Sequence, residues 1–163
     1  MAAGEPFDGR LPAAVFALLV TACFVAFFLT QHLKHTPTAV QMFKLTPRFS
    51  PTPSGHIKEE RISFRLAERD EVTVVVLDSA GVEVATLVHD QPVERYKQIS
   101  LRWSGRRGTP SPLRITTGSA GQPVLTPVLR GRAAPAGEYR VRVSLRRQDR
   151  TVLSPRSFTL VRP

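Results

Sequence analysis

Residues able to do acid–base, nucleophilic or metal chemistry are few and scattered in this chain. The four histidines are His32, His35, His56 and His89. Only His89 has a neighbouring acid, Asp90, and no motif orients the two toward a nucleophile. Glu59 and Glu60 are adjacent, so in a strand they face opposite ways and make a poor acid–base pair. No nucleophile elbow, phosphate-binding loop, dinucleotide fingerprint or zinc-ligand spacing is present. The sequence therefore predicts a protein that is not an enzyme and binds no metal or cofactor.

Arginine is the more informative residue type. Lys and Arg number 23 against 13 Asp and Glu, a net charge of +10 that favours acidic or phosphate-bearing partners. Arg106 and Arg107 lie in a Gly-rich stretch, where guanidinium groups bind phosphate or carboxylate bidentately. Arg140 and Arg142 share one strand face by period two. We take these four arginines as a candidate binding patch for a protein or an anionic envelope polymer, and expect no specific nucleic acid. The alternative is that they pair with glutamates and serve only solubility.

Residues 11–30 read LPAAVFALLVTACFVAFFLT and carry no charge. At about 1.5 Å per residue, a helix of this length matches a hydrocarbon core of about 30 Å. Pro12 stands at its start, where a missing N–H costs little. The pattern predicts a transmembrane helix over 11–31, after a short tail at 1–10.

Two other interpretations of this segment compete with an intact span. A cleaved signal peptide needs a basic leader, whereas MAAGEPFDGR has one Arg and two acids, and no good cleavage site follows the run. The stretch VTAC, ending at Cys23, resembles a bacterial lipobox, in which that cysteine would be lipidated. The apolar run continues through FVAFFL after Cys23, so an intact span explains its length better.

Beyond a linker at 32–45, the sequence alternates with period two. Inward positions are expected at Ile62, Phe64, Leu66, Val72, Val74, Val76, Ile99, Leu101, Trp103, Tyr139, Val141, Val143 and Leu145. A turn is expected at DSAG, residues 78–81. About seven short strands with turns between them predict an all-β, immunoglobulin-like sandwich over 46–163. The segment 104–137 is rich in Gly, Pro, Ser and Thr and predicts a long loop, with short edge strands at PLRIT and PVLTPVL.

The order of several motifs resembles the immunoglobulin-like domain of the flagellar hook-capping (FlgD-type) family. These are FSP at residues 49–51, ISFRL, VTVVVLDSAGVEVATLV, LRWSGR and PAGEYRVRV, covering roughly 49–145 around an insertion at 104–133. The chain departs from the family at TPSGHIKEE, where an acidic loop is usual, and at Ser104, where Asp is usual. The hook-capping protein's other regions are replaced here by a membrane segment, so we expect no role in the flagellar hook.

The resemblance implies an extracytoplasmic position, because similar domains lie outside the cytoplasm. The positive-inside rule, taken alone, would leave the larger domain in the cytoplasm, but the charge bias is small. We therefore expect a single-pass plasma-membrane protein that spans through Leu11–Thr30 and serves in adhesion or scaffolding at the bacterial envelope. The alternative is an accessory subunit of a larger membrane complex.

Overall fold

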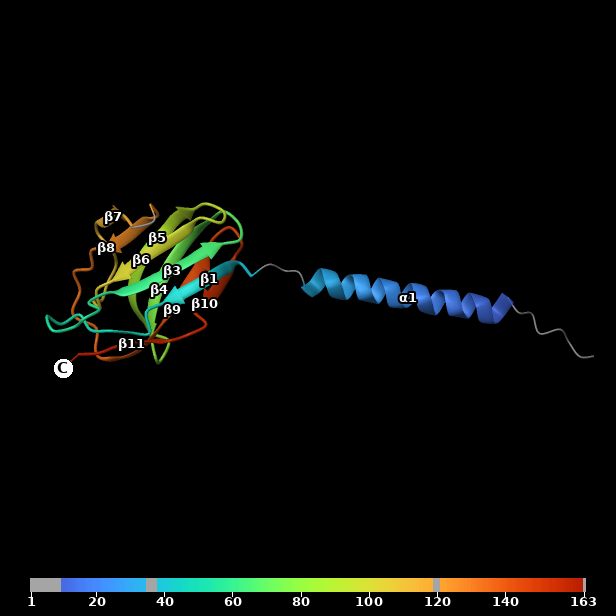
Figure 1. Cartoon of the computed structure of the whole chain (residues 1–163), viewed down its shortest axis with the longest axis horizontal. Coiled ribbons are helices and arrows are strands. Elements are labelled where there is room, and N and C mark those ends of the chain that lie inside the picture. The colour runs from blue at the N-terminus through green and yellow to red at the C-terminus, as the bar shows by residue number, and fades with distance from the viewer. Residues whose placement is uncertain (1–9, 35–37, 119–120, 163) are drawn as a thin grey trace, which may run out of the picture. The chain divides into compact units, whose positions relative to one another are not determined.

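The computed structural model describes residues 10–34, 38–118 and 121–162, and divides the chain into two compact units, 1–37 and 38–163 (Figure 1). Most of the tail expected at 1–10 and residues 35–37 of the expected linker lie outside the described residues. The first unit contains one helix, α1 (Arg10–Lys34). The second unit is built from strands and is described separately below.

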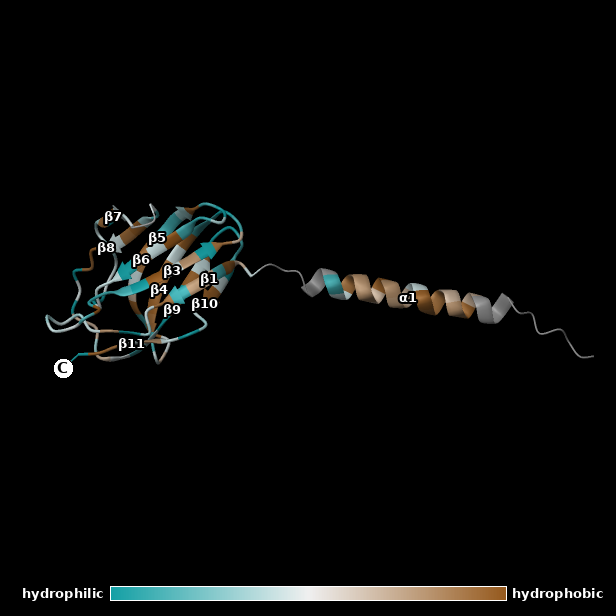
Figure 2. Ribbon diagram, viewed as in Figure 1, coloured by the Kyte–Doolittle hydropathy of each residue, from teal (hydrophilic) through white to brown (hydrophobic). Residues whose placement is uncertain are grey.

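Helix α1 carries no charged side chain between Ala14 and Gln31, and the side of it that Figure 2 presents is mostly brown, the colour of hydrophobic residues. The hydroxyl groups of Thr21 and Thr30 donate to the carbonyl oxygens of Ala17 and Ala26, at 2.8 and 2.6 Å. The two polar side chains are thus satisfied within the helix, which a segment in lipid requires. The helix is long and apolar enough to cross a membrane, and a signal sequence near the N-terminus would pass the same test.

The β-rich unit contains two mixed sheets, here called the first and the second sheet. The first sheet has the order β1 (Val40–Leu45), β3 (Glu60–Leu66), β6 (Gln98–Trp103), β8 (Pro123–Pro127) and β7 (Leu113–Thr117). The second has the order β2 (Arg48–Phe49), β11 (Phe158–Leu160), β9 (Gly137–Leu145), β4 (Asp70–Asp78) and β5 (Glu83–Val93), with β10 (Arg150–Leu153) also paired to β9. Pairing is antiparallel except between β6 and β8 and between β2 and β11.

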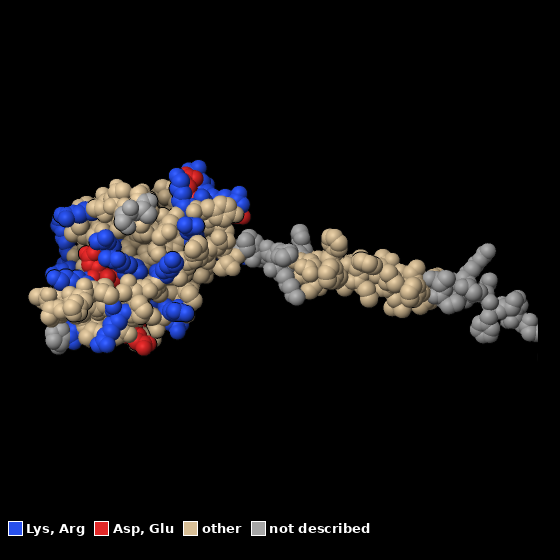
Figure 3. Space-filling model, in the orientation of Figure 1, with Lys and Arg blue, Asp and Glu red and all other residues tan. Residues whose placement is uncertain are grey.

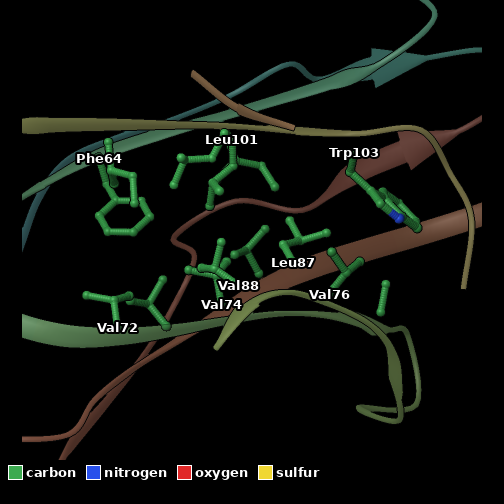
Figure 4. Packing of buried hydrophobic residues seen from close by; sticks show 14 of the residues in the cluster. Phe64, Val72, Val74, Val76, Leu87, Val88, Leu101 and Trp103 are labelled. Atoms are coloured by element: carbon green, nitrogen blue, oxygen red, sulfur yellow. The ribbon is translucent and has the colours of Figure 1, made fainter. Parts of the chain in front are cut away.

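Alternate residues of both sheets form one hydrophobic core. Figure 4 shows Phe64, Leu101 and Trp103 from the first sheet facing Val74 and Val76 from the second. All thirteen inward positions expected from the period-two pattern are buried. The outward residues of the first sheet therefore lie on the opposite face of the unit from those of the second.

The strands follow from residue types and short turn signals. β-branched side chains fill β4, where they pack well on a pleated surface. At its end, the Asp78 carboxylate accepts backbone N–H bonds from Ala80 and Val82, at 3.0 and 2.9 Å. Gly81 then adopts a φ of 79°, a conformation that glycine reaches without steric cost. The expected turn at 78–81 is confirmed.

The described part has eleven strands where about seven were expected. Strands were anticipated at the positions of β7 and β8, but of these two only β7 is an edge strand, because β8 lies between β6 and β7. β2 and β10 were not anticipated. β1 lies within 32–45, so the interpretation of that whole segment as a linker is wrong for Val40–Leu45. The structure confirms that the chain is mostly β, in two mixed sheets, with one apolar helix near the N-terminus.

Candidate functional site

The two arginines of β9, Arg140 and Arg142, point outward from the second sheet, as period two predicts. Arg140 is exposed, whereas Arg142 is half-buried and forms an ion pair with Glu83 of β5. The strand is paired on one side with β4 and on the other with β10 and β11, so the two side chains stand over the middle of the sheet. One of the two arginines, Arg142, is therefore paired with a glutamate, as the alternative hypothesis expects.

Arg106 and Arg107 follow β6 in a segment whose backbone is hydrogen-bonded on two sides. The Trp103 indole donates to the carbonyl oxygen of Arg106 at 2.8 Å. The Arg107 N–H donates to Arg132 at 2.9 Å, and its carbonyl accepts from Gly131 at 3.1 Å. A side chain at Gly131 would meet that carbonyl oxygen at 2.2 Å, so glycine is required there. Gly108, which follows Arg107, donates its N–H to Val84 of β5 and accepts the N–H of Thr86 from the same strand.

The four arginines of the candidate patch thus occupy two places: the outer face of the second sheet, and a segment fixed to the edge strand β5. Arg61, Arg65 and Arg102 lie on β3 and β6, in the first sheet, and so face the opposite way. Sequence reasoning placed each arginine on the outside but had no means of assigning strands to sheets. Binding by Arg106, Arg107, Arg140 and Arg142 stays a prediction.

A buried carboxyl group, Glu60, was not anticipated. It is fully buried, whereas its neighbour Glu59 faces outward and pairs with Arg102 at 3.3 Å. Oε1 of Glu60 accepts the backbone N–H of Thr46 at 2.7 Å. Burial raises the pKa of Glu60 to about 8, and the Thr46 N–H opposes this shift by favouring the charged form. The signal was present in the sequence, because Glu60 has the same parity as the inward residues Ile62 and Phe64.

Other polar groups hold turns together. The buried Asp70 carboxylate accepts N–H bonds from Arg147 and Gln148, at 2.8 and 3.2 Å, and so fixes the turn between β9 and β10. His89 is exposed and lies 3.6 Å from Asp90, which also pairs with Arg146 at 3.0 Å. Asp90 is thereby engaged in an ion-pair group and does not orient the imidazole toward a nucleophile.

Tyr139 lies at the start of β9 and contacts the core. Its hydroxyl donates to the carbonyl oxygen of Pro135 at 2.6 Å. Burial raises the pKa of the Tyr139 hydroxyl, and the positive charge of Arg107 opposes that shift. Within the residues that the structure describes, no group of three or more His, Cys, Asp or Glu side chains is placed to hold a metal ion.

The sequence was compared with protein-family models and with curated proteins. No protein-family model matches the chain, and no curated protein matches it significantly.

Proposed function

We propose that the chain is a single-pass membrane protein whose C-terminal unit is an extracytoplasmic, immunoglobulin-like domain that acts in adhesion or scaffolding at the bacterial envelope. The observation that carries the proposal is the presence, in one chain, of a helix that is uncharged and exposed from Ala14 to Gln31 and of a separate β-rich unit. The resemblance to FlgD-type domains is part of the proposal and supplies the extracytoplasmic position. The work of such a domain is binding, and no catalytic step is assigned to it.

Strand order supports the immunoglobulin-like assignment. In that fold one sheet has the order A-B-E-D and the other contains G-F-C, extended by C′ in variable-type domains. The strands β1, β3 and β6 take the places of A, B and E, and β9, β4 and β5 take those of F, C and C′. β10 and β11 both pair with the G side of β9. The order along the chain agrees for all of these strands.

Tyr139 is a second support. Many immunoglobulin-like domains carry a tyrosine near the start of strand F whose hydroxyl bonds to the backbone a few residues upstream. Tyr139 occupies that place on β9 and donates to Pro135, four residues earlier.

The place of strand D is where this unit departs from the family plan. Strand D precedes E in an immunoglobulin domain, and its sheets are antiparallel. Here β8 follows β6 in the chain and runs parallel to it. The hairpin of β7 and β8, which comes from the long segment 104–137, thus occupies the edge that D occupies elsewhere.

The proposal is tested by membrane fractionation and protease accessibility of the tagged full chain in intact cells. We expect the protein to remain in the membrane fraction after alkaline carbonate washing, and its β-rich unit to be digested from outside. A soluble chain, or a unit that is protected until the membrane is permeabilised, contradicts the proposal. Intact-mass analysis distinguishes an unmodified span from a lipidated N-terminus at Cys23.

The second candidate function is an accessory subunit of a larger membrane complex. The observation that favours it is β7, an edge strand with one unpaired side, on which Ile115 is 65% exposed. Exposed edges of this kind are ready to pair with another chain. Co-purification in mild detergent separates the two functions, because only a subunit brings stoichiometric partners with it.

A further inference from the structure

The two sheets differ in the charge of their strands. The five strands of the first sheet carry five basic residues: Lys44, Arg61, Arg65, Arg102 and Arg114. Their one acid is Glu60, which is buried in the core. The strands of the second sheet carry six acids and four arginines. Since Glu60 points inward, the outer face of the first sheet draws only positive charge from its own strands.

Strand register aligns three of these arginines. Arg61 pairs directly with Arg102 across β3 and β6. The parallel register of β6 and β8, continued by one residue, places Arg102 beside Thr126, which pairs with Arg114 of β7. We call Arg61, Arg102 and Arg114 the arginine row. Neighbouring strands lie about 4.8 Å apart, so three strand spacings give the row a length of roughly 14 Å.

A hollow of about 180 Å³ adjoins the arginine row. Its lining includes Arg61, Ser63, Ser100, Arg102 and Gln122. Guanidinium, hydroxyl and amide groups all donate hydrogen bonds. A phosphate group presents several strong acceptor oxygens and a negative charge, so it matches such a lining better than a neutral ligand does.

Most of this positive charge has no carboxylate partner. Among the residues that the structure describes, Arg102 is the one cation of these five that forms an ion pair, with Glu59 at 3.3 Å. Arg61 and Arg114 are exposed. On the face of the unit that Figure 3 presents, Lys and Arg likewise outnumber Asp and Glu. Arg61 and Arg114, the two uncompensated members of the row, lie roughly 14 Å apart, beyond the Debye length of about 8 Å at physiological salt, so a polyanion that meets both charges must be extended.

The strands of the first sheet offer no exposed ring for stacking a nucleic-acid base. Their aromatic residues are Phe43, Phe64 and Trp103. Phe64 and Trp103 are buried, and Phe43 stacks on Phe64 at 5.5 Å between ring centroids. Proteins that bind single-stranded nucleic acid combine a basic groove with exposed aromatic side chains. Because these strands expose no aromatic side chain on which a base could stack, a polyanion without bases is favoured as the ligand.

We propose that the outer face of the first sheet binds a linear envelope polymer that carries a phosphate in every repeat, with the arginine row contacting successive phosphates. The inference rests on the proposed function, because it names the partner of an envelope-binding domain. It assigns the contact to Arg61, Arg102 and Arg114 and to the hollow beside them.

The test measures binding of the full chain, in a nonionic detergent, to long-chain inorganic polyphosphate over a range of salt concentrations. One variant carries Arg61→Gln, Arg102→Gln and Arg114→Gln. The matched control carries Arg48→Gln, Arg150→Gln and Arg156→Gln, which removes the same charge from exposed positions on or between strands of the second sheet. Oligothymidylate and mixed micelles of the same detergent with phosphatidylglycerol are measured in parallel, and circular dichroism verifies that both variants are folded.

We expect the first variant to lose about tenfold or more in affinity for polyphosphate, and its log–log salt slope to fall by roughly 2. The control should stay within about twofold of the wild type. Equal losses in the two variants would show a net-charge effect and overturn the proposal. Tighter binding of oligothymidylate, or binding to the phosphatidylglycerol micelles alone, would also overturn it. Membrane fractionation is independent of these results, so the anchored-domain proposal stands or fails separately.

Discussion

The outer faces of the two sheets were built by the same alternating pattern, yet they carry different chemistry. In the second sheet, acids accompany the arginines: Glu83 pairs with Arg142, and Glu71 with Arg146 at 3.2 Å. In the first sheet, the strands have a single acid, and it faces the core. The comparison teaches that period two decides which side chains face water, whereas strand pairing decides which charges become neighbours.

The largest expected effect comes from the residue that joins the two sheets. The Trp103 ring, from the first sheet, lies 5.3 Å from Tyr139 and 5.9 Å from Phe158, both of the second sheet. Trp103→Ala should cost roughly 3–5 kcal/mol of unfolding free energy, because it leaves a cavity between the sheets. Urea unfolding followed by circular dichroism measures this. A loss below about 1 kcal/mol would mean that the sheets do not depend on this contact.

A pH-dependent effect is expected from the buried acid of the first sheet. The pKa of Glu60 is raised to about 8, so the folded state holds the proton more tightly than the unfolded chain does. This contribution is complete below the unfolded pKa, near 4.5, and is lost as the pH rises through about 8. Between pH 6 and pH 8 the unfolding free energy should fall by about 2 kcal/mol on this account.

Two glutamine variants isolate this effect. Glu60→Gln keeps an acceptor for the Thr46 N–H and should remove that pH dependence. Glu59→Gln, at the outward-facing neighbour, should retain it. Urea midpoints at several pH values provide the measurement, and an unchanged slope in Glu60→Gln would assign the dependence to another group.

A smaller effect is expected at the start of β9 in the second sheet. Tyr139→Phe keeps the ring in the core and removes the hydrogen bond to Pro135. Leaving the carbonyl without its partner should cost about 1 kcal/mol or slightly more. Thermal melts provide the value, with Tyr96→Phe as an exposed control. Equal melting temperatures for Tyr139→Phe and the wild type would argue against a stabilising tyrosine corner.

The smallest effect on stability, and the sharpest test of the comparison, comes from neutralising acids of the second sheet. Glu71→Gln, Glu83→Gln and Glu138→Gln should together change stability by less than about 1 kcal/mol, because exposed ion pairs contribute little. The same change should raise polyphosphate affinity by exposing a second basic face. If the affinity stayed the same, arginines without acidic neighbours would not be sufficient for polyphosphate binding, and the hollow of the first sheet would be needed as well.

The sequence predicted the interior of this protein better than its surface. Alternation placed Val72, Val74 and Val76 in the core because each strand has only two faces and one of them is apolar. The four-residue strand β10 was not predicted, because RTVL is too short to show an alternation of apolar and polar residues. β2, with two residues, has no pattern to detect.

The candidate site was less accessible to sequence reasoning for a different reason. Parity showed that Arg61, Arg102 and Arg140 face outward, but sheet membership depends on pairings between residues far apart in the chain. Arg114 lay in a segment interpreted mainly as loop, so its place beside Arg102 emerged only from the register of β7 and β8. Glu60 was missed although its parity was known, because acids are rarely fully buried.

Trp103 is the one tryptophan of the chain, and its indole N–H is bonded to the backbone just ahead of Arg107. The protein therefore contains an intrinsic fluorophore that is fully buried between the sheets. Its emission should be blue-shifted in the folded state and sensitive to the attachment of the 104–108 segment. Because the ring points away from the outer face of the first sheet, a ligand seated there would leave this emission unchanged, so folding and surface occupancy can be followed as separate optical signals.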